Sequence, residues 1–150
     1  MKRALGIVLC GVILTTFSGA AQAAPATKAD AKAMVVKAAA FIKANGREKA
    51  LAEFNNPNGQ FTKGELYIVA IDMNGVMLAH PNVKLIGKNL NDLRDSDGTL
   101  VNKGFIDTAK SGGGWFNFKW TNPATKTIQA KTTFVQKADD DWLISCGVFL

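Results

Sequence analysis

The sequence predicts an α+β fold built around one antiparallel sheet. Apolar residues recur at helical spacing over 28–44, whereas from residue 66 onward they form short runs separated by turn residues. The segments follow the order helices, two strands, a polar excursion and three strands. Helices and strands that are grouped in this way, rather than alternating, are typical of α+β folds.

The first 24 residues are expected to be a cleavable signal peptide that is not part of this fold. Lys2 and Arg3 precede an uncharged apolar stretch at 5–17, and the triplet at 21–23, Ala-Gln-Ala, matches the small-x-small pattern of a cleavage site. An uncleaved membrane anchor is the alternative. The apolar stretch is shorter than the ~20 residues that a membrane span needs, so cleavage is favoured.

Residues 25–150 are then expected to form one domain with a single hydrophobic core. Loss of Lys2 and Arg3 lowers the net charge from +6 to +4, because 16 basic and 12 acidic residues remain. The lysines are scattered rather than clustered, so nucleic acid is not an expected partner. No later segment is long and apolar enough to be membrane-embedded. We expect a periplasmic or secreted protein.

A long helix is predicted at 28–44. Thr27 with Asp30 matches a capping box at its start, and Asn45-Gly46 is a good stop. Its apolar stripe is wide, which leaves two interpretations: the helix buries a second face against a partner chain, or it lies in a groove of its own domain. The residues that widen the stripe are Val36, Ala40 and Phe41.

A short second helix at 47–54 leads into the predicted strands. The run 66–71 is apolar on both faces, as expected for a strand with neighbours on either side, and Asp72-Met73-Asn74-Gly75 is a hairpin turn. The chain returns through 76–80. After an irregular stretch with a helix at about 100–110, three closing strands are predicted at 115–120, 127–137 and 142–149.

Tyr67 and His80 are predicted to face each other across the first hairpin. A turn at 72–75 pairs residues whose numbers sum to 147, which places both side chains on the face of Val69 and Ile71. A phenol and an imidazole at the open end of an apolar face can orient a small polar ligand. Alternatively, His80 only satisfies its own hydrogen bonds. A one-residue bulge would break the pairing.

Lys131 lies in the middle of a predicted strand. Pairing across the turn at 122–123 places it opposite Phe116, on the side of Phe118 and Trp120. If that side is internal, the ammonium needs an anion, and a ligand carboxylate would supply one. The alternative is a lysine that faces solvent from the outer side of the sheet.

The sequence lacks the groups that most catalytic and metal sites require. His80 is the single histidine and Cys146 the single cysteine after the predicted signal peptide, which excludes multi-histidine metal centres, zinc clusters and c-type haem attachment. Nucleophile-elbow, P-loop and dinucleotide motifs are also missing. We therefore expect no enzyme activity and no cofactor, and we expect Cys146 to be a buried small hydrophobe.

The polar segment 89–98 holds a further candidate. Asp95-Ser96-Asp97-Gly98 hints at a calcium loop, but the glutamate at the twelfth position is missing, so an Asx-capped turn is favoured. Arg94 reaches toward a bound acid in one interpretation, and pairs with Asp92 or Asp97 in the other.

A series of short motifs identifies a family. In their order and spacing the chain resembles the single Cache domain family, the extracytoplasmic PAS-like sensor modules of bacterial chemoreceptors and sensor kinases. The resemblance covers about 30–149. The motifs are GREKALAEFN at 46–55, GQF at 59–61, LYI at 66–68, DMNG at 72–75, AHP at 79–81, IGKNL at 86–90, GW at 114–115, WTNP at 120–123 and AK at 130–131.

This resemblance implies a PAS-like fold, with a long N-terminal helix on a five- to six-stranded antiparallel sheet and a pocket between the sheet and the segment that covers it. It also implies that the ligand is a small organic acid, a C2–C4 carboxylate, and that Trp115 lines the pocket with Tyr67, His80 and Lys131. Phe118 and Phe134 stand where many relatives have tyrosine, so a more apolar pocket is expected.

The expected function is therefore that of a non-catalytic sensory or binding domain. Family members usually continue into a membrane helix and a signalling module, so a membrane receptor or kinase is an expected partner. The alternative is an interaction module that forms a homodimer or docks on a receptor through its N-terminal helix. The predicted ligand-binding residues are Tyr67, His80, Arg94, Trp115, Phe118, Trp120 and Lys131.

Overall fold

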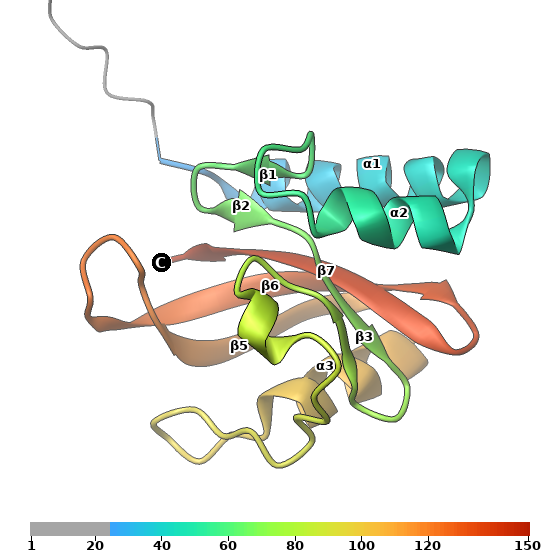
Figure 1. Ribbon diagram of the computed structural model, residues 1–150. Coiled ribbons are helices and arrows are strands. Elements are labelled where there is room, and N and C mark those ends of the chain that lie inside the picture. Colours follow the sequence, from blue (N-terminus) through green and yellow to red (C-terminus); the bar gives the residue numbers. More distant parts are fainter. Residues whose placement is uncertain (1–24) are drawn as a thin grey trace, which may run out of the picture.

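The computed structural model describes residues 25–150, and the predicted signal peptide at 1–24 lies outside this part of the chain. Figure 1 shows three layers. Helices α1 (Lys28–Asn45) and α2 (Arg47–Phe54) cover one face of the sheet, which we call the helix face. Helix α3 (Val101–Lys110) and the irregular chain before it cover the other, the cavity face.

The sheet has five antiparallel strands in the order β4-β3-β7-β6-β5. A long N-terminal helix on such a sheet confirms the predicted α+β, PAS-like fold. The most central strand, β7, is buried from Trp142 to Val148 because both faces of the sheet are covered. The strands are β3 (Val69–Asp72), β4 (Met77–Ala79), β5 (Gly114–Thr121), β6 (Ile128–Asp139) and β7 (Trp142–Phe149). A separate two-stranded sheet is formed by β1 (Thr62–Lys63) and β2 (Leu66–Tyr67).

Helix α1 begins and ends as its sequence predicts. The Thr27 side chain accepts a hydrogen bond from the Asp30 amide, and the Asp30 carboxylate accepts one from the Thr27 amide, which completes the capping box. Gly46 ends the helix at φ 82°. Small apolar side chains face β6 and β7 and let the helix lie close to the sheet: Ala31, Val35 and Ala38 are fully buried.

The helix therefore packs on its own domain, in agreement with one of the two interpretations. Phe41, one of the residues that widen its stripe, packs edge-on against Phe61. Val36 points outward and is 53% exposed. A partner on that side stays a prediction. No helix within residues 25–150 has both the length and the apolar character needed to cross a membrane.

The first hairpin differs from its predicted pairing. The run 66–71 is not one strand: β2 ends at Tyr67, which pairs with Thr62, and β3 begins at Val69. Between β3 and β4 the register slips at a bulge, from Ala70 opposite Ala79 to Ile71 opposite Met77. The predicted register of Tyr67 against His80 is therefore wrong.

The register already differs from the predicted one at the turn, before the bulge. The Asp72 carboxylate accepts hydrogen bonds from the amides of Asn74 and Val76, so the turn is closed by a side chain as well as by the backbone. Val76 also bridges to Asn89 of the covering chain. The Val76 carbonyl accepts from the Asp72 amide, so the turn continues the register of Ile71 opposite Met77, and the extra residue of the bulge is Leu78.

The second hairpin also has a different register, but the consequence is smaller. Lys131 lies opposite Phe118 rather than the predicted Phe116. The difference is two residues, and side chains alternate with a period of two, so every side chain stays on its predicted face. Lys131, Phe116, Phe118 and Trp120 therefore share the cavity face, as expected.

Candidate ligand-binding site

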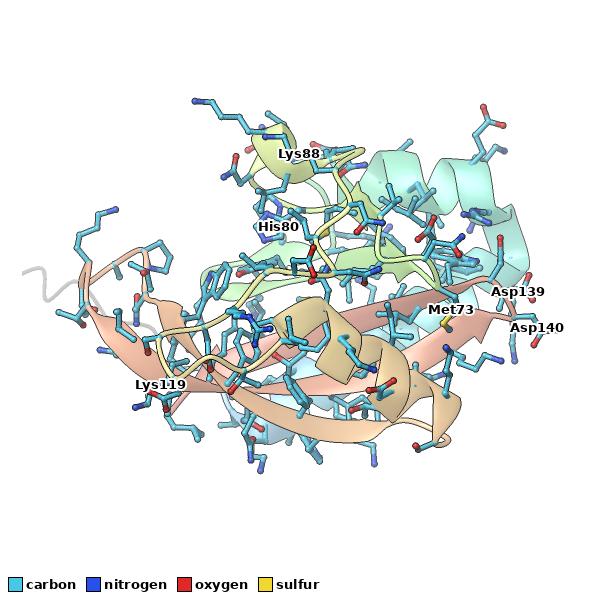
Figure 2. The ribbon with its side chains drawn as sticks, turned by 90° about the horizontal axis from the view of Figure 1, so that it is seen from below. Met73, His80, Lys88, Lys119, Asp139 and Asp140 are labelled. Atoms are coloured by element: carbon cyan, nitrogen blue, oxygen red, sulfur yellow. The ribbon has the colours of Figure 1, made fainter. Side chains whose placement is uncertain are left out.

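A cavity lies between the sheet and the chain that covers it, which we call the cover segment (residues 81–110). The centres of water-sized molecules have about 40 Å³ of room inside it. The strands contribute Tyr67, Val69, Met77, Lys131, Thr133 and Ser145 to its wall, and the cover segment contributes Leu85, Leu93, Val101, Asn102 and Phe105. Figure 2 views the molecule from this side, with α3 in front of the strands.

Lys131 is the charged group of the cavity. Its side chain is buried, with the residue only 4% exposed, and its Nζ donates a hydrogen bond of 3.0 Å to Tyr67 Oη. The same ammonium lies 4.6 Å from the centre of the Tyr67 ring and 4.7 Å from that of Phe149, at cation–π distance. The ion pairs found within residues 25–150 join other lysines to aspartates, so none of them neutralises Lys131.

Gly147 makes room for this lysine. It lies opposite Thr133 in the β6–β7 ladder, on the cavity face. A Cβ atom at Gly147 would stand 3.0 Å from Lys131 Cε and 2.2 Å from Thr133 Oγ1. The lysine side chain therefore lies flat over the bare backbone of β7, and a glycine is required beneath it.

His80 lies beside Lys131 as a neutral ring. Burial, reinforced by the positive charge of Lys131, lowers the pKa of His80 from 6.5 to about 4. Its Nδ1 accepts a 2.9 Å hydrogen bond from the Asn82 amide, which leaves the ring proton on Nε2. The ring meets Tyr67 edge-on at 5.6 Å between centroids. The two side chains thus come together although they are not paired in a ladder.

Residues outside the sheet fix the position of His80. Asn55, which follows α2, accepts from the His80 amide at 3.2 Å and donates to the Leu78 carbonyl at 3.1 Å. Figure 2 shows His80 next to the part of the cover segment that carries Lys88. The end of α2 therefore holds the histidine at the edge of the cavity.

Three groups of the cavity are hydrogen-bond donors. The Tyr67 oxygen accepts from Lys131 and so keeps its own hydrogen available, the His80 ring offers Nε2–H, and the ammonium of Lys131 has two hydrogens left. Such a cluster suits a ligand group that only accepts hydrogen bonds and carries negative charge.

Aromatic side chains close the apolar part of the cavity. Phe118 meets Phe105 of α3 edge-on at 5.4 Å and Trp120 at 5.9 Å. Both Phe118 and Trp120 line the cavity. Gly104 lets α3 approach β5, because a Cβ there would stand 2.1 Å from the Phe116 ring.

Two residues of the predicted site lie elsewhere. Trp115 is on the helix face: it packs edge-on against Phe134, and Lys28 of α1 lies over its ring at 4.7 Å. Trp115 neighbours Phe116 in β5, so alternation alone requires it to face away from the cavity. Arg94 is exposed and donates to the Gly98 carbonyl, which closes its own turn.

The Asp95–Gly98 turn is held by hydrogen bonds of its own, as favoured over a calcium loop. Asp95 accepts from the amides of Asp97 and Thr99 and, through its other oxygen, from the Lys119 amide. These bonds, with the one from Lys119 foremost, lower the pKa of Asp95. In residues 25–150 no cluster of three potential metal-ligating side chains is found.

Cys146 is a buried thiol that faces α1. Its Sγ lies 3.8 Å from Met34 Sδ, and burial raises its pKa to about 11. It therefore acts as a small hydrophobe, as expected, although its backbone borders the cavity.

Several cavity residues were not predicted from the sequence. Thr133 follows from Lys131 by the alternation of β6, and a polar residue on the inner side of α3 could have signalled Asn102. Ser145 and Gly147 carry no such signal, because a strand as apolar as 142–149 does not show which face borders an empty space. The structure alone reveals them.

Comparison with known proteins identifies relatives of this domain. The family model described as Single Cache domain 2 matches residues 20–150. The sensor histidine kinase MctS of Rhizobium johnstonii is 38% identical over 86 residues, which are 56% of this chain and 19% of the kinase. The methyl-accepting chemotaxis protein McpP of Pseudomonas putida is 32% identical over 82 residues, 53% of this chain and 15% of that receptor. The matches thus span less than a fifth of either curated relative.

Solved structures agree with the fold. A methyl-accepting chemotaxis protein from Vibrio parahaemolyticus superposes with a TM-score of 0.69 at 28% identity, over 81% of this chain and 87% of that one. A Cache chemosensory domain, whose structure explains carboxylic acid recognition, superposes with a TM-score of 0.62 at 26% identity, over 79% of this chain and 85% of that one.

Proposed function

Because this chain belongs to the Single Cache domain 2 family of extracytoplasmic sensory domains, we propose that its cavity binds a small organic acid as the signal it senses. Cache domains are the sensing parts of chemoreceptors and sensor kinases and are not themselves catalytic.

The observation that carries the proposal is the buried ammonium of Lys131. Burial of a charge is costly unless an opposite charge compensates it, and Tyr67 Oη and two aromatic rings compensate only in part. A ligand carboxylate beside Nζ would complete the pairing. The hydrogens of Tyr67 and His80 would reach the same carboxylate oxygens.

The size of the cavity favours acids at the short end of the C2–C4 range. One water molecule needs roughly 10–15 Å³ of such space, so about 40 Å³ holds roughly three waters. An acid of two or three carbons is of that size, since its bonded atoms lie closer together than separate waters. Phe118, Trp120 and Val69 would contact its carbon chain.

One solved relative supports the ligand class. The Cache chemosensory domain associated with carboxylic acid recognition has the same fold over most of both chains. It is 26% identical to this chain, so it supports an acid as ligand without fixing which acid.

The setting of the domain is part of the proposal. The predicted signal peptide would deliver it to the periplasm or beyond, and the relatives in chemoreceptors and sensor kinases point to a membrane receptor or kinase as the protein that uses its signal. Of the predicted site, Tyr67, His80, Phe118, Trp120 and Lys131 are proposed as ligand-binding residues.

Isothermal titration of the purified protein with acetate, propanoate and butanedioate tests this function. We expect binding of the two smaller acids and weak or no binding of the dicarboxylate. Lys131→Met keeps the length of the side chain and removes the charge, so it should weaken binding of the small acids at least 100-fold.

Lys137→Met is the matched control, because Lys137 lies on the same strand but pairs with Asp140 at the surface. It should bind as the natural protein does. Absence of binding at millimolar acid, or equal binding by the Lys131→Met protein, would refute the proposal.

A further inference from the structure

We propose that the hydroxyl of Ser145 recognises an oxygen on carbon 2 of the acid, so that the site selects 2-hydroxy or 2-oxo carboxylates over unsubstituted ones. This inference rests on the proposed function, since it concerns the same cavity. It adds a second polar contact, at the end of the ligand away from the ammonium.

Ser145 has a buried hydroxyl without a partner. The residue is 0% exposed, and its Oγ makes no hydrogen bond in residues 25–150. It lines the cavity. Leaving a buried hydroxyl unpaired is unfavourable, and such groups in native proteins usually receive a partner from water or a ligand.

The one buried polar side chain next to Ser145 on this face of β6 and β7 is the diagonal neighbour Thr133, and the Ser145 hydroxyl makes no hydrogen bond to it. The cross-strand neighbours of Ser145 are Val69 on β3 and Val135 on β6, and two residues away along β7 lie Leu143 and Gly147. Each of these side chains is apolar or missing. The cavity above the sheet is therefore where a ligand oxygen could supply the missing hydrogen bond.

The spacing between Ser145 and Lys131 fits one small molecule. The end of the Lys131 side chain lies over Gly147, and residues two apart in a strand are about 6.8 Å apart. Lys131 Cε and the Ser145 side chain are thus separated by roughly that distance, and the ammonium beyond Cε lies toward Tyr67 and Phe149. Two hydrogen bonds of about 2.8 Å, joined by a carboxylate and its neighbouring carbon, span such a gap. An acid oxygen would meet Lys131 while the oxygen on carbon 2 meets Ser145.

Thr132 provides a comparison within the same structure. It too is fully buried with an unpaired hydroxyl. It lies opposite Val148 in the ladder, on the helix face, and does not line the cavity. Thr132→Val therefore removes an equivalent hydroxyl without touching the proposed ligand, and is the matched control for Ser145→Ala.

The test compares three acids of equal carbon number: propanoate, 2-hydroxypropanoate and 2-oxopropanoate. Isothermal titration of the natural protein should show at least a tenfold preference for one or both of the substituted acids. Ser145→Ala should reduce that preference to near one while the dissociation constant for propanoate changes less than about threefold. Thr132→Val should keep the preference.

The outcomes separate the two proposals. Suppose that all three acids bind through Lys131, but that the natural protein shows no preference or the Ser145→Ala protein retains it. Then Ser145 does not bind the oxygen on carbon 2, and only this inference fails. If none of the acids binds, the proposed function fails and this inference with it. Thermal unfolding of each variant confirms that an altered preference does not come from loss of the fold.

Discussion

Several residues of the cavity lower the stability of the domain while no ligand is bound. Lys131 carries a charge into the interior without a counter-charge, Ser145 an unpaired hydroxyl, and His80 a ring that cannot easily be protonated. Each of these is unfavourable for folding alone. Each would become favourable with the proposed acid in the cavity, which is the usual relation between a binding site and the stability of its scaffold.

Replacement of Lys131 should therefore stabilise the empty protein. Lys131→Met keeps the volume and removes the buried charge, so we expect the free energy of unfolding to rise by about 1 kcal/mol in the absence of acid. Urea denaturation measures this. Lys137→Met should change the free energy by less than ~0.5 kcal/mol, because its ion pair is exposed. Marked destabilisation by Lys131→Met would show that the ammonium is needed to hold the fold.

His80 should make stability depend on pH between about 4 and 6.5. Its pKa is about 4 in the folded protein and 6.5 when unfolded, so within this range the unfolded chain binds the additional proton. Stability is therefore full above pH 6.5 and falls as the pH decreases toward 4. At ~1.4 kcal/mol per unit of pKa difference, protonation of His80 can lower the free energy of unfolding by at most about 3 kcal/mol. The partial exposure of the ring makes the loss smaller.

Urea denaturation at a series of pH values measures this slope. His80→Asn keeps an acceptor for the Asn82 amide and cannot titrate, so its stability should vary less over the same range. An equal slope in both proteins would mean that His80 is not the group responsible.

At the scale of elements, β6 and β7 serve two functions because their side chains alternate. Lys131, Thr133, Ser145 and Gly147 border the cavity, whereas Thr132, Phe134, Cys146 and Val148 face α1. The ligand site and the long N-terminal helix are thus separated by the thickness of one sheet. A displacement of β7 on one face is necessarily felt on the other, since protein interiors are closely packed.

Gly147 is the residue at which this arrangement is most sensitive. Gly147→Ala would bring its Cβ to 2.2 Å from Thr133 Oγ1 and 2.8 Å from the Thr132 carbonyl, so we expect destabilisation of about 2 kcal/mol and loss of acid binding as Lys131 is displaced. Urea denaturation and titration with propanoate measure the two effects. Gly147→Ala combined with Thr133→Ala removes the closer contact and should recover part of the stability. No recovery would indicate that the backbone contact dominates.

The elements show how far the sequence predicts this structure. Helix periodicity, the capping box at Thr27 and the turn residues predict the three α-helices and the strands of the main sheet to within a few residues, but not the short 3-10 helix at Val83–Leu85. The alternation of side chains in β5 and β6 places Lys131 and Phe118 on one face. This prediction is correct although the register differs by two residues, because side chains alternate with a period of two. The predicted register is wrong at the first hairpin. There the Asp72 carboxylate accepts from a turn amide and Val76 bridges to the cover segment, and the sequence pattern predicts neither contact.

The site is less predictable than the elements for a physical reason. A family motif points to Trp115, although the alternation of β5 excludes it from the face of Phe116 and Phe118. Ser145 and Gly147 matter because of the empty space above them, and a cavity arises from the packing of distant segments. Such a space has no local signature in the chain.

At the scale of the whole molecule, the cavity is covered by a cover segment that is attached to the sheet at its β4 edge. The Gly87 amide donates to the Met77 carbonyl, the Met77 amide to the Lys88 carbonyl, and the Leu90 amide to the Gly75 carbonyl. These bonds cover the outer edge of β4 and hold the cover segment against it. We expect an acid held between Lys131 and the cover segment to leave when this segment opens.

Binding should therefore slow hydrogen exchange of the cover segment more than that of α1. If the segment opens to release the acid, a concentration 100 times the dissociation constant raises the free energy of opening by about 2.7 kcal/mol, which slows exchange about 100-fold. We expect this at the amides of Gly87 and Leu90 with saturating propanoate. Amides of α1 that exchange by local fraying should change little, and in the Lys131→Met protein no amide should respond. Equal slowing of α1 and the cover segment would mean that release requires unfolding of the whole domain, and that the cover segment does not act as the gate of the cavity.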